Sequence, residues 1–381
     1  MAGKTVKILG MMSGTSGDAI DGAMMSFGRS GASELLWFDS YSFSPTEFAR
    51  IQKLMSSADA SDITLGASYI AELYARACQQ FFAAGHEPPD YIAAHGQTVY
   101  HQPKPSDWDG LALTGTLQLL NGSLLARRTG IPVICDFRSA DMAVGGEGAP
   151  LVPFADLYLF GKKAKGDLLL LNIGGMANIS AIRGGRCPQM LSAFDTGPGN
   201  VLMDAAMQRF GLGNYDQGGC LAASGSSHND VVKRFLQDPY FLAPPPKSTG
   251  REYFNAARLD QISSWVKPQM NAADLLATLL DITVDSIVVA IKALSDQLRF
   301  PVDLAVSGGG ALNLELMRRL TVRLTNLARV TTSDAFAVPI MAKEAMAFAV
   351  LGNAFVRRRP GNLPVATGAR QKVILGGLYP V

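Results

Sequence analysis

The stretch ILGMMSGTSGDAIDGAMMSF, residues 8–27, joins two short apolar runs through a centre of Gly, Ser and Thr that carries Asp18 and Asp21. Apolar runs separated by small polar residues are typical of two strands joined by a turn. A third apolar run follows after a turn that contains Gly, Ser and Arg. We therefore predict that the chain opens with a meander of three strands, near 6–12, 22–28 and 35–43.

Helical and strand patterns alternate after the meander. Apolar residues recur at helical spacing from Asp62 to Gly85, and the strand YIAAHG follows. A second helix near 118–129 leads to the strand IPVICD. The amino-terminal part is thus predicted as β-β-β-α-β-α-β, a mixed sheet with helices packed on it.

The same scheme restarts after the glycine-rich passage AVGGEGAPLVP. DLLLLNIGGMANISAI predicts a second hairpin, LSAFDTG a third strand and VDLAVSGGG a later one. Helices are expected near 200–210, 272–295 and 312–327. Because the two halves share the order of their elements, we predict an α/β fold of two lobes, each a mixed sheet flanked by helices, with a ligand cleft between them.

Composition limits the partners. The chain has 381 residues, with 34 basic and 32 acidic ones, a net charge of +2 and no basic arm or acidic tail. This argues against nucleic-acid and membrane partners. The sequence predicts no signal peptide and no membrane span, so we expect a cytoplasmic protein. Its four cysteines form no CxxC pair, and we expect buried free thiols in a reducing compartment.

The two hairpin turns, MSGTSGD and NIGGMAN, are candidate phosphate sites, because Gly-rich turns expose backbone N–H groups. One such turn alone is better explained as a tight hairpin, but two at matching places favour phosphate binding. The first has no lysine and is not a P-loop, so charge neutralisation requires Mg²⁺ and carboxylates. The candidates are Gly14, Thr15, Ser16, Gly17, Asp18, Ala19, Ile20 and Asp21, and Gly174 and Gly175 in the second turn.

A third glycine group, SGGGALN, ends an apolar strand and opens a helix. Its residues Gly308, Gly309 and Gly310 let a flat ring or a sugar approach the backbone. Three glycine elements of this kind suit a nucleoside triphosphate, with phosphates in the two turns and the nucleoside at the third.

Polar residues also follow two predicted strands of the amino-terminal part. His95 and Gln97 follow one, and Asp136, Arg138 and Asp141 follow another. Satisfied hydrogen bonds and an ion pair explain these clusters about as well as a binding site does.

Asp195 is the sharpest catalytic candidate. It follows the apolar strand LSAF and precedes TGPGN, which predicts a carboxylate held rigidly at a strand end. Such a group suits a general base. The alternative is a cap for the next helix, but Asn200 lies nearer to that helix start.

Motifs along almost the whole chain resemble the anhydro-N-acetylmuramic acid kinases, within the superfamily of acetate and sugar kinases, heat-shock-70 chaperones and actin. They are MSGTSGDAIDGA, AHGQTVYHQP, DFRSADMAVGGEGAPLVP, LNIGGMANIS, FDTGPGNVLMDA, KSTGREYFN, SGGGALN and KEAMAFAVLG. Single motifs are weakly specific, but this many in order are highly specific. Gly17, Glu147 and Ala206 depart from the family pattern, and none of them removes a candidate catalytic group.

The resemblance implies two actin-like lobes, 1–140 plus about 345–381 and 141–344. It implies ATP-dependent opening of the 1,6-anhydro ring of anhydro-N-acetylmuramic acid by water, giving N-acetylmuramic acid 6-phosphate and ADP in peptidoglycan recycling. Both glycine turns would hold ATP phosphates, with Asp21 near Mg²⁺, directly or through water. Gly308 to Gly310 would border the nucleoside, and Asp195 would activate the water.

The sugar side of the site is expected to contain His95, Gln97, Asp136 and Arg138, because both clusters leave the same edge of the first sheet. Arg138 is a candidate partner for the lactyl carboxylate of the sugar, or for a structural pairing with Asp136 or Asp141. The sequence leaves a homodimer open.

Two other functions compete with this hypothesis. A kinase of another sugar or of a small carboxylate would use the same ATP site, but only the anhydro-sugar reaction consumes water and breaks an internal glycosidic bond. A nucleotide-driven hinge protein without enzymatic activity would need a peptide-binding domain or a polymer interface, and the sequence shows no appended domain.

Overall fold

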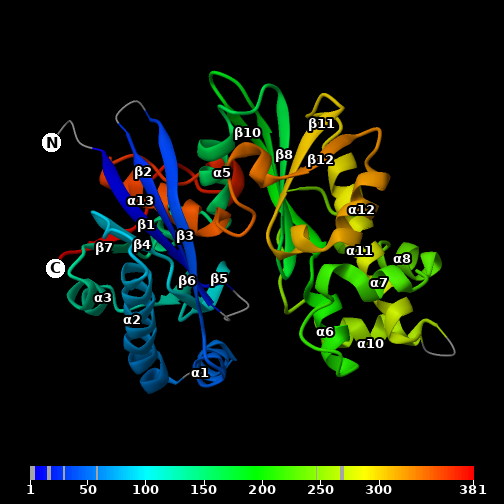
Figure 1. Cartoon of the computed structure of the whole chain (residues 1–381), viewed down its shortest axis with the longest axis horizontal. Helices are drawn as coiled ribbons and strands as arrows, with labels where there is room; N and C mark the ends of the chain where they lie inside the picture. The colour runs from blue at the N-terminus through cyan, green and yellow to red at the C-terminus, as the bar shows by residue number, and fades with distance from the viewer. Residues whose placement is uncertain (1–4, 15–18, 29–30, 57–58, 246, 267–269) are drawn as a thin grey trace. The chain divides into compact units, whose positions relative to one another are not determined.

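The computed structural model describes residues 5–14, 19–28, 31–56, 59–245, 247–266 and 270–381. The chain folds as two compact units: unit 1 comprises Met1–Tyr158 and Ala342–Val381, and unit 2 comprises Leu159–Met341. Each unit contains one main sheet with helices packed on it (Figure 1). The expected α/β class with mixed, helix-flanked sheets is confirmed. Residues 141–158, expected in the second lobe, belong to unit 1.

The main sheet of unit 1 has six strands in the order β13-β7-β4-β1-β2-β3. The first three strands form the expected antiparallel meander, and β4 and β7 continue the sheet in parallel. The strands are β1 (Val6–Met12), β2 (Ala19–Phe27), β3 (Ser33–Ser42), β4 (Tyr91–Ala94), β7 (Val133–Cys135) and β13 (Gly377–Tyr379).

Strand β1 is buried on both faces, because its side chains alternate between two helical layers. Leu9 and Met11 belong to the core that β1 shares with α2 (Ala60–Ala83). Gly10 faces α13 (Lys343–Val356), and a Cβ at this position would lie 2.0 Å from the carbonyl oxygen of Ala345. The other helices of this part are α1 (Pro45–Ser56), α3 (Gly122–Thr129), α4 (Ser139–Ala143), α5 (Val152–Phe160) and α14 (Pro364–Thr367).

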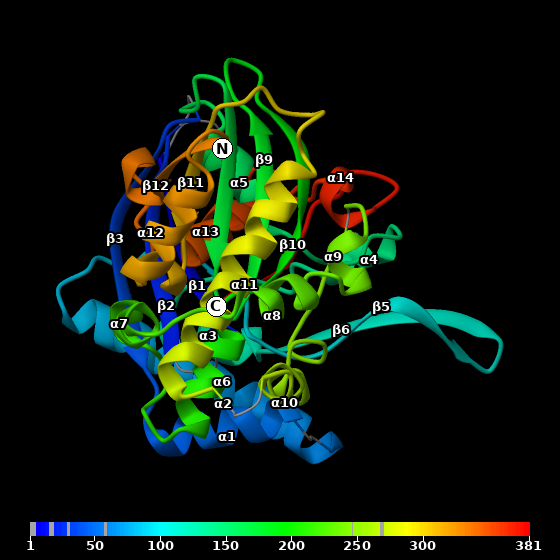
Figure 2. The same ribbon diagram turned by 90° about the vertical axis from the view of Figure 1, so that its right-hand side faces the viewer.

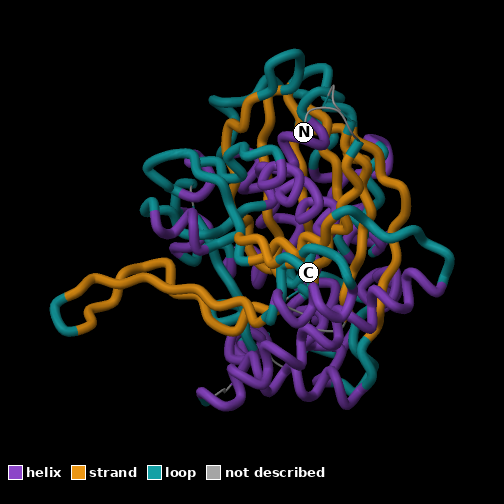
Figure 3. The backbone as a smooth tube through the Cα atoms, turned by 90° about the vertical axis from the view of Figure 1, so that its left-hand side faces the viewer, coloured by secondary structure: helices purple, strands orange, loops and turns teal. Residues whose placement is uncertain are grey.

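A two-stranded ribbon, β5 (Gln97–Trp108) with β6 (Leu111–Leu119), was not expected from the sequence. It extends away from α1 and α2 of the same unit (Figures 2 and 3). The helix expected near 118–129 therefore begins only at Gly122, where the Asn121 side chain caps it. Residues 118–119 of the expected helix belong to β6 instead.

The main sheet of unit 2 repeats the first. Its order is β10-β9-β8-β11-β12, which matches β3-β2-β1-β4-β7 position by position, including the parallel pairing of the last three. The internal repeat expected from the sequence is therefore present in the topology. The strands are β8 (Asp167–Ile173), β9 (Met176–Arg183), β10 (Gln189–Pro198), β11 (Val302–Ser307) and β12 (Ala328–Thr332).

The helices of unit 2 follow the expected pattern with shorter bounds. The longest, α11 (Ala272–Lys292), contributes most of its side chains to the core. The expected helix at 312–327 is a 3₁₀ turn, η2 (Gly309–Leu312), then α12 (Leu314–Arg323), and the unexpected β12 follows. The remaining ones are α6 (Val201–Arg209), η1 (Gln217–Gly219), α7 (Cys220–Ser224), α8 (Asn229–Phe235), α9 (Pro239–Leu242), α10 (Ala256–Ser264) and η3 (Ser333–Phe336).

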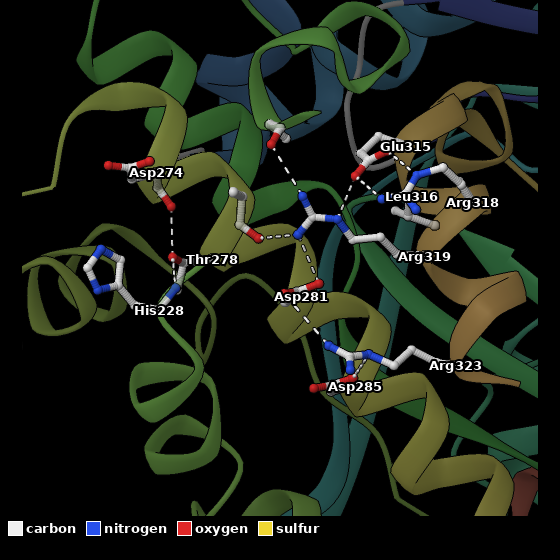
Figure 4. Close-up of polar contacts among 12 residues, drawn as sticks. His228, Asp274, Thr278, Asp281, Asp285, Glu315, Leu316, Arg318, Arg319 and Arg323 are labelled. Carbon is white, nitrogen blue, oxygen red and sulfur yellow. Dashed lines mark hydrogen bonds and ion pairs between the residues drawn. The ribbon is translucent and has the colours of Figure 1, made fainter. Parts of the chain in front are cut away.

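A network of charges joins α12 to α11 (Figure 4). The Arg319 guanidinium contacts Glu315 at 2.7 Å and Asp281 at 3.0 Å, and it also donates to two backbone carbonyls. Arg323 bonds Asp285 at 3.1 Å. Hydrogen bonds from Arg318 and then Arg319 lower the pKa of Glu315 to about 2. The network fixes the helix that follows Gly308–Gly310.

All four cysteines are free thiols. Cys78 and Cys135 are buried, but Cys187 and Cys220 are exposed, so the expectation of burial is wrong for two of the four. Among the described residues, none of the helices combines the length and the apolar character needed to cross a membrane.

Candidate active site

Asp195 lies at a β-bulge in β10, the edge strand of the unit 2 sheet. Asp195 pairs with Asn178 of β9, whereas Gly197 pairs with Ala177, so one extra residue stands in β10. The strand continues to Pro198, which corrects the expectation that Asp195 stands at a strand end. A bulge redirects side chains, and here it sets the direction of the carboxylate.

The backbone and the carboxylate of Asp195 are both held by hydrogen bonds. Its N–H donates to the carbonyl of Lys247 at 3.0 Å, and the Thr249 N–H donates to its Oδ2 at 2.9 Å. The Tyr240 hydroxyl donates to the Asp195 carbonyl at 2.6 Å. The chain from Lys247 to Thr249 thus covers the edge of β10 and orients the acid.

The surroundings of Asp195 make it more basic than an ordinary carboxylate. Burial raises the pKa of Asp195 from 3.8 to about 6, the Thr249 N–H lowers it in part, and the charge of Glu252 raises it. At neutral pH such a group is ionised and still accepts a proton readily. This combination suits a general base.

We expect kcat/KM to fall by about tenfold for each pH unit below about pH 6, because protonated Asp195 cannot accept a proton. For a carboxyl of ordinary pKa the loss would begin near pH 4. The measurement is kcat/KM from about pH 5 to pH 8, with ATP binding measured in the same buffers. A rate that stays constant down to about pH 5 would contradict the assignment.

The Gly174–Gly175 turn joins β8 to β9 and rests on the start of α6. The N–H groups of Gly199, Asn200 and Val201 donate to the two carbonyls of this turn. Asn200 occupies the cap position, but its side chain forms no capping hydrogen bond, so that expectation is wrong. The turn itself satisfies the helix donors.

In the third glycine group, SGGGALN, the packing requires glycine at positions 308 and 310. A Cβ on Gly308 would lie 2.7 Å from the carbonyl oxygen of Ile173, and a Cβ on Gly310 would lie 2.3 Å from the Cγ2 atom of the same residue. Gly308 also has a φ of +79°, which disfavours other residues. These contacts place the third glycine group directly beside the Gly174–Gly175 turn.

Gly175 and Gly309 leave open space beside the backbone. Among described residues other than chain neighbours, a Cβ on Gly175 would have only Arg251 Nη2 within 4 Å, at 3.8 Å. A Cβ on Gly309 would have only Asn200 Nδ2, at 3.9 Å. A ligand can approach both backbones closely here, with a nitrogen donor at each place.

The first glycine turn is described only at its flanks, since Thr15, Ser16, Gly17 and Asp18 lie outside the described residues. Ala19 and Ile20 belong to β2, and Ile20 is buried. The Asp21 Oδ1 accepts a hydrogen bond from the Ser40 hydroxyl at 2.7 Å. Of the two acids in this hairpin, Asp18 and Asp21, the structure therefore describes only Asp21.

Gln97 holds the start of this turn. Its side chain is buried, accepts from the Ser13 hydroxyl at 2.9 Å and donates to the Gly14 carbonyl at 3.4 Å. The structure therefore gives Gln97 a supporting role, and its contact with sugar stays a prediction.

His95 and Arg138 lie together in unit 1. Arg138 Nη2 is 3.0 Å from His95 Nε2, and His95 Nδ1 is 3.0 Å from the carbonyl oxygen of Gly96. Burial, and then the charge of Arg138, lower the pKa of His95 to about 3. The imidazole is therefore neutral, and it donates through Nδ1 and accepts through Nε2.

Neither acid offered as a structural partner pairs with Arg138. Asp136 is exposed and accepts from the Ser139 hydroxyl, and buried Asp141 accepts from the Gly148 N–H at 2.9 Å. Arg138 instead donates to the Gly148 carbonyl at 2.9 Å. Burial lowers the pKa of Arg138 to about 10, which keeps the guanidinium charged at neutral pH.

Two of the positions that depart from the family pattern are described. Glu147 is exposed, and its backbone N–H donates to the carbonyl of Thr367. Ala206 is fully buried in the core of unit 2, on α6. Gly17 lies outside the described residues.

Thr249, Arg251 and Asp204 were not among the site residues predicted from the sequence. The first two belong to the motif KSTGREYFN, which was a signal for the family only. Thr249 contacts Asp195, about 55 residues away in sequence, and Arg251 lies beside Gly175, about 75 residues away. Contacts over such separations cannot be read from a local motif.

No three His, Cys, Asp or Glu side chains in the described ranges could hold a metal ion by themselves. Mg²⁺ in phosphoryl transfer needs fewer protein ligands, because it is bound by one or two carboxylates together with water and substrate phosphates. The Asp21 carboxylate is a hard oxygen donor at the edge of a glycine turn and fits this requirement.

The family model for anhydro-N-acetylmuramic acid kinase matches residues 6–381. A relative of that name from Variovorax paradoxus is 40% identical, with 100% of both chains covered. Another from Gloeobacter violaceus is 45% identical over 76% of this chain and 74% of its own, and one from Trichormus variabilis is 38% identical over 98% and 97%. The chain therefore belongs to the anhydro-N-acetylmuramic acid kinase family.

Proposed function

We propose that this chain converts 1,6-anhydro-N-acetylmuramic acid, ATP and water into N-acetylmuramic acid 6-phosphate and ADP. The family membership supports the substrate class. The observation that carries the mechanism is the Asp195 carboxylate, held by the Thr249 N–H with its pKa raised to about 6. We place the reaction in the cytoplasm, where ATP is available.

In the proposed reaction, water attacks the anomeric carbon while Asp195 accepts its proton. The bond between C1 and O6 breaks, and its electron pair goes to O6. O6 then bonds to the γ-phosphorus of ATP, and the bond from phosphorus to the bridging oxygen breaks to release ADP. One proton, on Asp195, remains to be released.

The glycine turns are proposed to hold the ATP phosphates. The hairpin turn after β1 and the Gly174–Gly175 turn after β8 occupy equivalent positions in two sheets of the same topology. Gly309 leaves space for the nucleoside beside the second turn. Mg²⁺, held through Asp21 or through a water on it, would neutralise phosphate charge.

The test is mass spectrometry of the products formed from ATP, Mg²⁺ and the anhydro-sugar in water enriched in oxygen-18. We expect a sugar 6-phosphate with one labelled oxygen at C1. Preformed N-acetylmuramic acid 6-phosphate in the same water is the control for exchange. Phosphorylation without label, or of another sugar only, would instead support the alternative kinase.

We expect Arg138→Ala to raise the KM for the sugar by about ten- to a hundredfold and to change the KM for ATP much less. A charge-assisted hydrogen bond to the lactyl carboxylate contributes about 1.5–3 kcal/mol, which gives this factor. The measurement is the KM for each substrate at saturation with the other.

Arg128→Ala is the matched control, since Arg128 is exposed on α3 and pairs with Glu72 at 2.7 Å. Both KM values should stay unchanged in that variant. If Arg138→Ala raised both KM values equally, Arg138 would have a structural role and would not recognise the sugar.

A further inference from the structure

Residues 247–253 form a loop between α9 and α10 that is fixed at both ends. Lys247 Nζ donates to the carbonyl of Tyr240 at 2.9 Å and lies 4.8 Å from the centre of the Tyr240 ring. At the other end, the N–H groups of Tyr253 and buried Phe254 donate to the carbonyl of Gly250. The side chains between these anchors are therefore presented from a fixed backbone.

Arg251 is an unpaired guanidinium on this loop. It is exposed and forms no hydrogen bond or ion pair with any residue in the described part of the chain. In contrast, Arg258 bonds Asp238 at 2.6 Å, and Arg319 bonds two acids. A guanidinium whose five N–H donors bond no described protein group is suited to bind the anionic group of a ligand.

The surroundings of Arg251 are those of an anion site. Its Nη2 lies 3.8 Å from where a Cβ on Gly175 would stand, so it borders the open space beside that turn. Two residues earlier, the Thr249 hydroxyl oxygen is buried and has no hydrogen-bond partner among the described residues. The N–H of the same Thr249 is bonded to the Asp195 carboxylate, so this hydroxyl lies near the proposed base.

Asp204, the acid whose pKa responds to the charge of Arg251, does not pair with it. Burial raises the pKa of Asp204 on α6 to about 6, and the charge of Arg251 lowers it only in part. Within the described residues, no hydrogen bond or ion pair joins the two side chains. The guanidinium therefore keeps its capacity for a ligand.

We propose that Arg251 binds the terminal phosphoryl group of ATP and stabilises its charge during transfer. A planar guanidinium matches two phosphoryl oxygens at once, and the position beside Gly175 is next to the proposed phosphate turn. The same loop orients Asp195, so residues 247–253 couple phosphoryl recognition to the proton acceptor. The inference rests on the proposed use of ATP.

The experiment compares the affinities for ATP and ADP, measured by calorimetry with Mg²⁺ and without sugar, in the wild type, Arg251→Gln and Arg251→Lys. We expect Arg251→Gln to weaken ATP binding by about ten- to a hundredfold and to leave ADP binding unchanged, because only ATP has the terminal phosphoryl group. Its kcat should fall by about a thousandfold or more. Arg251→Lys should recover part of the ATP affinity.

Arg186→Gln is the matched control, because Arg186 is exposed in the turn between β9 and β10, at the opposite end of β9 from Gly175. It removes the same charge and should change neither nucleotide affinity. Equal changes for ATP and ADP in Arg251→Gln, no change for either, or a change confined to the KM for sugar would overturn the inference. Failure of the wild type to form labelled product would count against the proposed function alone, since the nucleotide comparison uses no sugar.

Discussion

Asp195→Asn is expected to lower kcat by about a hundred- to ten-thousandfold while ATP affinity stays close to that of the wild type. The amide keeps the size of the side chain and can still accept the Thr249 N–H through its oxygen, but it cannot take the water proton. Ring opening and phosphorylation should fail together, because the proposed reaction couples them. Turnover and ATP affinity are measured on the same preparation.

Asp303→Asn serves as the control for Asp195→Asn. Asp303 is the second residue of β11, where it pairs with Arg329 at 2.7 Å, and its substitution should leave turnover unchanged. Near-normal turnover in Asp195→Asn would reject Asp195 as the base. Loss of ATP affinity equal to the loss of turnover would mean that the carboxylate supports nucleotide binding instead.

Arg319→Ala should lower the free energy of unfolding by about 3–5 kcal/mol, because it leaves buried Asp281 without its main partner and removes one of the two arginines that bond Glu315. The side chains of Glu315 and Asp281 are 10% and 6% exposed, so water replaces the lost contacts poorly. The measurement is denaturant unfolding at neutral pH. Nucleotide affinity should also fall, since α12 follows the 3₁₀ turn η2 that contains Gly309 and Gly310.

Arg329→Ala tests whether burial, and not the mere loss of an ion pair, causes this effect. Its pair with Asp303 is 80% and 36% exposed, and removing it should cost about 1 kcal/mol or less. If both variants lost the same small free energy, the α11–α12 network would have no special role in stability.

The sequence was sufficient for features that depend on neighbouring residues. Apolar runs and glycine turns predicted both meanders and the strands β4, β7 and β11, because strand and turn preferences act over a few residues, but they did not predict β12 or β13. The ribbon β5–β6 was missed, since its strands carry Pro, Lys, Asp and Gly and have no continuous apolar pattern. The end of α12 was placed too late, because Leu324 and Leu327 continue the helical apolar spacing after the helix ends at Arg323.

The sequence by itself determined the α/β class, the internal repeat, the family and the identity of the candidate acid. Tertiary structure alone decided how that acid behaves, because its pKa depends first on burial and then on Thr249 and Glu252, which are distant in sequence, and Thr249 also orients its carboxylate. It also decided which glycines pack against Ile173 and which leave space. Arg251 lies beside Gly175 and forms no hydrogen bond or ion pair with another described residue, which is likewise a result of the tertiary structure. Burial and long-range contacts create these properties, and neither can be read from the spacing of residues along the chain.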